Sequence, residues 1–199
     1  MDYQQLIGRN ISHHRYSAKM ATTVILVFGV GNFFGLVIGG GGGSYLYRKD
    51  RRYPSLLAGL AAILSCPPLW GLLNFVDNRT PLLATGFISL TAGLFSGATG
   101  PIVKATVQNV SLPTTRGQCF ALLNTFDDFG RGLGPVFVAA LVKSMGGRTP
   151  AFNVGVCGWL LCGFFNLMVF FTVSRDERYV QAKLAASLKE ETRNEAVTS

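Results

Sequence analysis

The chain has 199 residues and a formal net charge of +8, but only 14% of its residues are charged and 49% are hydrophobic. A typical soluble domain carries about 25% charged residues, and here the mean hydropathy is positive. The basic residues lie in short segments between long apolar runs, which argues against a soluble nucleic-acid-binding domain and favours a chain embedded in lipid.

Four runs contain no Asp, Glu, Lys or Arg, and each exceeds the roughly 20 residues that cross about 30 Å of hydrocarbon. They cover residues 20–47, 53–76, 80–103 and 149–174. A fifth segment, 117–142, is equally apolar except for three charged residues near its middle. The sequence therefore predicts an all-α integral membrane protein with five transmembrane helices and a multi-pass bundle over residues 20–174.

The first predicted elements are a polar arm over residues 1–19 and the span that follows it. No secretory signal-peptide pattern is found in the arm, which carries three Lys or Arg, so an upstream helix is expected to help it reach the outer side. Within the span, glycines recur every four residues and share one helix face: Gly31, Gly35, Gly39 and Gly43. Such a face lets another helix approach closely, and tight packing and sliding both fit it.

The Lys and Arg residues of the loops predict how the chain is oriented in the membrane. With five spans, the side that holds loop 48–52, segment 104–116 and the tail 175–199 carries eleven Lys and Arg, against six on the other side. The positive-inside rule predicts that this side and the C-terminus are cytoplasmic. The tail is expected to form a short amphipathic surface helix around Val180, Leu184 and Leu188, followed by a disordered end.

The loop after the first span resembles the signature between the second and third helices of each half of major facilitator superfamily transporters. Four of its residues match the signature: Gly43, Arg48, Arg51 and Arg52. Tyr47 stands where the family has an acid, and Asp50 stands where it has a second glycine. The resemblance implies a cytoplasmic gate built on these residues, and it places any ion-pair latch at Tyr47 in question.

A second match fixes the register. Pro113, Arg116 and Gly117, followed by the glycine-rich stretch 130–135, resemble the loop between helices 10 and 11 and the eleventh helix, especially in spinster-like carriers of organic solutes. Together the two matches imply that the five spans are helices 8 to 12, part of the C-terminal half of a twelve-helix fold. The arm 1–19 would then be the outer loop between helices 7 and 8.

The resemblance implies a transmembrane transporter of small organic solutes or lipid-like molecules that works by alternating access. Five helices form only one wall of such a site, so the chain alone is expected to be inactive. Its expected partners are the lipid bilayer, an N-terminal half or another transporter half, and a small-molecule substrate. A non-transporting membrane scaffold or regulatory half-transporter is the alternative.

Charges inside a membrane span are costly and mark candidate functional sites. Arg131 is one helical turn from both Asp127 and Asp128, so it can pair with either, and Asn124 is one turn below the acids. One carboxylate is left for substrate or proton coupling, although a purely structural ion-pair cluster also fits. Asn32 in the first span is a lesser candidate for the same site.

An enzyme is disfavoured. Both histidines, His13 and His14, lie outside the spans, and the adjacent Asp127 and Asp128 point about 100° apart on one helix, unlike a convergent aspartyl pair. No cofactor or metal is expected, because the four cysteines lie in apolar runs without CxxC spacing.

Overall fold

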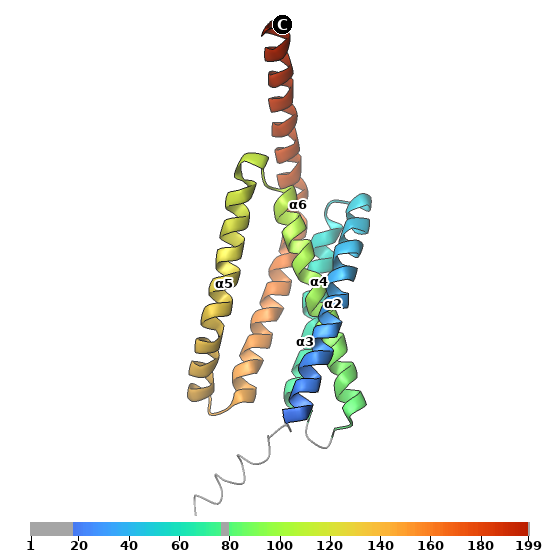
Figure 1. Ribbon diagram of the computed structural model, residues 1–199, viewed down its shortest axis with the longest axis vertical. Helices are drawn as coiled ribbons and strands as arrows, with labels where there is room; N and C mark the ends of the chain where they lie inside the picture. Colours follow the sequence, from blue (N-terminus) through green and yellow to red (C-terminus); the bar gives the residue numbers. More distant parts are fainter. Residues whose placement is uncertain (1–17, 77–79, 199) are drawn as a thin grey trace, which may run out of the picture.

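The computed structural model describes residues 18–76 and 80–198, and within these ranges the chain is all-helical (Figure 1). Most of the predicted arm 1–19 lies outside the described residues. The five helices are α2 (Ala18–Lys49), α3 (Tyr53–Asn74), α4 (Leu82–Asn109), α5 (Pro113–Ser144) and α6 (Arg148–Thr198). Each predicted apolar segment corresponds to one helix.

Four of the helices are long and apolar enough to cross a membrane. They are α2 over Thr22–Lys49, α3, α4, and α6 over Arg148–Asn194. The prediction of an all-α, multi-pass membrane protein is confirmed at this level. The central charges keep α5 out of this set, and its crossing of the bilayer stays a prediction.

Loop residues explain where several helices begin and end. Pro54 and Pro113 occupy the first turns of α3 and α5, where the missing N–H of proline costs no hydrogen bond. At the end of α5 the Met145 N–H donates to the Leu141 carbonyl at 2.8 Å, and Gly146 then takes a φ of 71°, which glycine adopts without strain.

Two expectations about helix ends need correction. α4 continues through Pro101 to Asn109, six residues beyond the predicted end of the span. α6 runs without interruption to Thr198, so the expected short surface helix is continuous with the span, and the expected disordered end is wrong as far as Thr198. No Gly or Pro follows Gly163, and the extension is rich in strong helix formers.

The packing is inside-out relative to a soluble protein. Apart from Glu177, nearly all of the most buried side chains are small, such as Ala62, Ser65 and Ala92, whereas Leu83 is 89% exposed and Phe171 is 76% exposed. Small residues at helix contacts and large apolar side chains on the outside are typical of a membrane bundle, where lipid covers the apolar surface.

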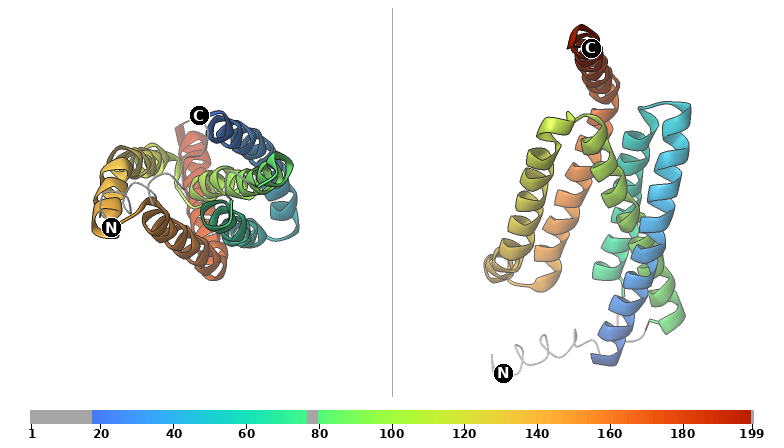
Figure 2. Two further views of the ribbon diagram at one scale, coloured as in Figure 1. Left: turned by 90° about the horizontal axis from the view of Figure 1, so that it is seen from below. Right: turned by 45° about the horizontal axis from the view of Figure 1, so that its top comes forward.

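The helices form a core of four with α5 at the side. α2 packs most extensively on α4, and α3 packs on both α4 and α6, whereas α5 touches α6 and α4 only sparsely. Viewed along the bundle, α5 lies beside α6 and apart from α2 and α3 (Figure 2). None of the residues of α5 is buried.

Candidate functional site

A cavity of about 800 Å³ lies between α5 and the core helices. Ligand sites of small molecules span about 300–1,000 Å³. Its polar lining includes four residues predicted from the sequence: Asn32, Asn124, Asp127 and Arg131. The fifth, Asp128, is exposed on α5 and does not line the cavity.

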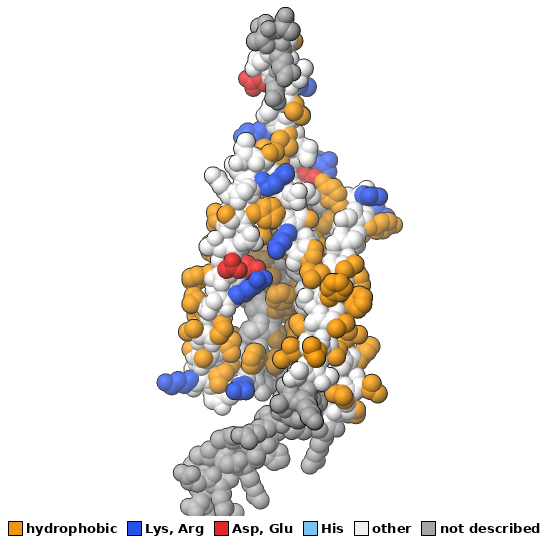
Figure 3. Space-filling model, in the orientation of Figure 1, with side chains coloured by type: hydrophobic (Ala, Val, Ile, Leu, Met, Phe, Trp, Pro, Cys, Tyr) orange, Lys and Arg blue, Asp and Glu red, His pale blue; other side chains and the backbone are white. Residues whose placement is uncertain are grey.

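The charged pair of the cavity is on α5. Arg131 Nη2 lies 2.8 Å from Asp127 Oδ2 across one helical turn, and the two side chains are 73% and 50% exposed. Acidic and basic side chains meet midway along the bundle, among hydrophobic ones (Figure 3). The structure therefore pairs Arg131 with Asp127, and the carboxylate left over, Asp128, lies outside the cavity, contrary to the expectation that it would serve substrate or proton coupling there.

The opposite wall of the cavity is polar on α2 and α4. Asn32 Nδ2 lies 3.5 Å from Ser96 Oγ, which itself donates to the Gly93 carbonyl at 3.0 Å. Lys104 of α4 also lines the cavity. This wall offers amide and hydroxyl groups to a solute, while Arg131 and Lys104 offer positive charge.

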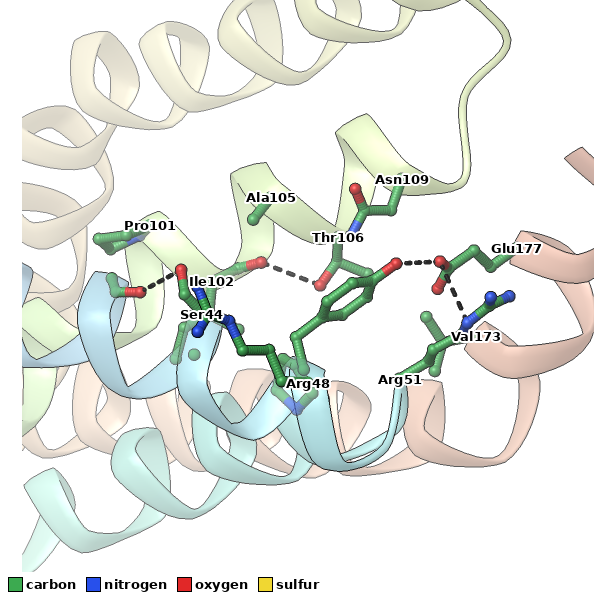
Figure 4. Close-up of a pocket in the computed structure, with 14 residues that line it drawn as sticks. Ser44, Arg48, Arg51, Pro101, Ile102, Ala105, Thr106, Asn109, Val173 and Glu177 are labelled. Atoms are coloured by element: carbon green, nitrogen blue, oxygen red, sulfur yellow. Dashed lines mark hydrogen bonds and ion pairs between the residues drawn. The ribbon is translucent and has the colours of Figure 1, made fainter. Parts of the chain in front are cut away.

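A second pocket of about 430 Å³ lies between the C-terminal ends of α2 and α4 and the middle of α6 (Figure 4). Three residues of the predicted gate motif line it: Gly43, Arg48 and Arg51. Arg52, Pro113, Arg116 and Gly117 do not line it, so the structure does not gather the two halves of the predicted motif in one pocket.

The sequence analysis missed the carboxylate at the centre of this pocket. Glu177 of α6 is 1% exposed; the Tyr47 hydroxyl donates a hydrogen bond to its Oε1, and Arg51 Nε lies 3.6 Å from the same oxygen. We call Tyr47, Arg51 and Glu177 the Glu177 clasp. It joins the end of α2 and the following loop to α6.

The clasp brings a carboxylate from a helix distant in the sequence to Tyr47 and Arg51. A tyrosine beside several arginines was a signal that a carboxylate from elsewhere would complete the group. The sequence alone did not choose among the acids after residue 174, because their orientation depends on the unbroken course of α6.

Comparison with protein-family models, with curated proteins and with solved structures finds no match for this chain.

Proposed function

We propose that this chain is one part of a transmembrane transporter that moves small organic solutes or lipid-like molecules by alternating access. The observation that carries the proposal is the cavity between α2, α4 and α5, where Asn32, Asp127 and Arg131 face a common space. A polar space among membrane helices suits a solute that must leave water on one side and return to it on the other.

The exposure of the charged pair supports the need for a second helical bundle. A charged side chain at the bilayer centre costs about 3 kcal/mol or more on insertion scales. Asp127 and Arg131 lie midway along α5, and half or more of each side chain is uncovered. Another bundle or a water-filled passage must therefore cover this face, as in transporters whose binding site lies between two halves.

The sequence resemblance to the major facilitator superfamily supports the same proposal. In that fold two six-helix halves rock about a central site. The motif residues on loop 48–52 and at the start of α5 agree with a C-terminal half, and the glycines of stretch 130–135 agree with a spinster-like carrier. The complementary half is the proposed partner.

Transport by reconstituted protein tests the proposal. The chain is placed in liposomes alone and with a co-expressed N-terminal half, and uptake of lysolipid, sugar and organic-anion probes is measured under a proton gradient. We expect saturable uptake only with the second half. Asp127→Asn should lower this uptake about tenfold or more, because charge-assisted contacts contribute about 1.5–3 kcal/mol.

Asp128→Asn is the matched control, since it removes the same charge from the adjacent residue outside the cavity. Equal losses for the two variants would contradict the assignment of the cavity as the transport site. Absence of uptake for every probe and pairing, with assembly of the two halves intact, would favour the alternative of a non-transporting scaffold or regulatory half-transporter.

A further inference from the structure

We propose that an apolar pocket between α2, α3 and α6 binds one acyl chain of a membrane phospholipid. The pocket has a volume of about 490 Å³. It lies near the start of α2, the end of α3 and the start of α6, which share the end of the bundle opposite loop 48–52 (Figure 1). The proposal does not depend on transport, and it applies equally to a regulatory membrane protein.

The pocket follows from the way in which three helices pack. α2 and α6 both pack on other core helices, but within the described residues their backbones do not approach each other closely. The space left between them is walled by aliphatic and aromatic side chains, such as Ile25, Leu69, Leu73 and Phe152. An empty space of this kind deprives its lining of dispersion contacts, so an occupant that restores them is favoured.

The lining is unsuited to water or to a polar solute. Among the described residues that line the pocket, Trp159 carries the only polar side-chain atom, and its Nε1–H donates to Ser65 Oγ at 2.7 Å. A buried water needs two to four polar partners. The pocket therefore favours an apolar occupant, and around apolar membrane helices that occupant is lipid.

The position of the pocket along the bundle fits the chain of a phospholipid. Its wall on α3 covers residues 69–76, about 10 Å at about 1.5 Å per residue, out of the about 15 Å of hydrocarbon in one leaflet. The groups at its outer end are typical of a membrane interface. Asn74 and Asn153 exchange hydrogen bonds of 2.9 and 3.1 Å, and Trp70 packs edge-on against Phe75. A phospholipid with its head group at this level has its acyl chains at the level of the pocket.

Trp159 allows a direct measurement. It lines the pocket, whereas the other of the two tryptophans, Trp70, does not. The purified 199-residue chain with Trp70→Phe therefore reports on Trp159 alone. In an uncharged detergent it is titrated with phosphatidylcholine brominated on its acyl chains, because bromine quenches the fluorescence of a tryptophan that it contacts. We expect saturable quenching that unbrominated phosphatidylcholine reverses.

Filling the pocket with a side chain tests the location. Gly155 lines the pocket, and a Cβ there would meet nothing within 4 Å, so a larger side chain can be added without a backbone clash. Gly155→Phe should weaken lipid binding about tenfold or more, because it displaces at least about two CH₂ groups of the acyl chain. Gly86→Phe is the matched control, since a Cβ at Gly86 is equally unobstructed and the residue does not line the pocket. It should change binding less than about twofold.

Three results would overturn the proposal. Trp159 also lines the cavity of Asp127 and Arg131, so equal quenching in the Gly155→Phe and Gly86→Phe variants would place the lipid outside the apolar pocket. The second result is the absence of saturable quenching. The third is reversal by cholesteryl hemisuccinate and not by unbrominated phosphatidylcholine, which would identify a sterol site. Gly155→Leu should weaken binding in the same direction, and it replaces Gly155→Phe if that variant does not elute as a monodisperse species.

Discussion

At the scale of single residues, the Glu177 clasp contains a buried carboxylate that needs compensation by its neighbours. A buried carboxylate is stable only when donors or positive charges compensate it. Glu177 has the Tyr47 hydroxyl and the Arg51 guanidinium on one oxygen, while its second oxygen, Oε2, is buried without a hydrogen bond to any described residue. Removal of the Tyr47 hydroxyl or of the Arg51 guanidinium is therefore expected to lower the stability of the folded protein, because no other described residue compensates Glu177.

Replacing Tyr47 with Phe tests this dependence. Tyr47→Phe keeps the ring but removes the donor, and a buried acceptor that loses its partner costs about 1–3 kcal/mol. We expect a lower thermal unfolding midpoint in detergent. Tyr45→Phe is the matched control, because Tyr45 is 62% exposed on the same helix and Phe keeps its stacking with Lys49. Equal midpoints for the two variants would argue against the clasp.

Residue-level prediction from the sequence succeeded where partners are close in the chain. The pairing of Arg131 with Asp127 follows from helical spacing and is present in the structure. The choice of Asp127 over Asp128 did not follow, because both acids are one turn from the arginine. Glu177 was missed because its partners lie 126 and 130 residues away, and only the course of α6 along α3 brings Glu177 to the end of α2.

At the scale of helices, α2 and α4 make the closest contact of the bundle. The four glycines of the predicted ladder, Gly31, Gly35, Gly39 and Gly43, are all buried. Glycines of α4 also lie against the α2 backbone, since a Cβ at Gly93 would lie 2.9 Å from Asn32 N. The backbones thus meet without side chains between them, as the spacing predicted.

A single added methyl group tests this contact. A Cβ at Gly39 would lie 2.6 Å from Ala98 Cα, whereas one at Gly41 would have nothing within 4 Å. We expect Gly39→Ala to destabilise the bundle by about 1–3 kcal/mol, the usual cost of overpacking, and to lower its unfolding midpoint. Gly41→Ala, in the same glycine run, should be neutral or slightly stabilising. A neutral Gly39→Ala would refute the close approach.

Helix boundaries were harder to predict than helix contacts. The third span was predicted to end at residue 103, but α4 passes through Gly100 and Pro101 and continues to Asn109, because a membrane helix tolerates an interior proline when neighbouring helices support it. For α6, the change from apolar to charged residues marks the end of a span and not the end of a helix. Val180, the first member of the predicted stripe, is buried, while Leu188 is 62% exposed.

At the scale of the whole molecule, the two ends of the bundle differ in charge. Loop 48–52, the turn between α4 and α5, and the extension of α6 share one end, and the turn between α5 and α6 lies at the other (Figure 1). The first of these ends is the side for which the sequence analysis counts eleven Lys and Arg residues. The loops that were predicted to share one side therefore lie at one end of the bundle, and which end faces the cytoplasm stays a prediction.

Accessibility labelling tests whether α5 crosses the bilayer. Single cysteines are placed at Asp50, Thr114 and Ser144 in a version without the four native cysteines, all of which are free. We expect Asp50→Cys and Thr114→Cys to react from the cytoplasmic side and Ser144→Cys from the opposite side, because α5 separates its two ends by 32 residues. Labelling of all three from one side would show that α5 lies along the membrane.

Because α6 is unbroken, a tilt of its membrane-embedded part also moves its C-terminal extension. Residues 175–198 continue the helix beyond the predicted span, which at about 1.5 Å per residue adds about 36 Å. If the helix tilts as one rigid body, a tilt of about 10° in the membrane-embedded part displaces the far tip by about 6 Å. A small change of helix tilt near the cavity thus becomes a larger displacement at the C-terminal end of α6. The Glu177 clasp lies near the point where the extension leaves the predicted span.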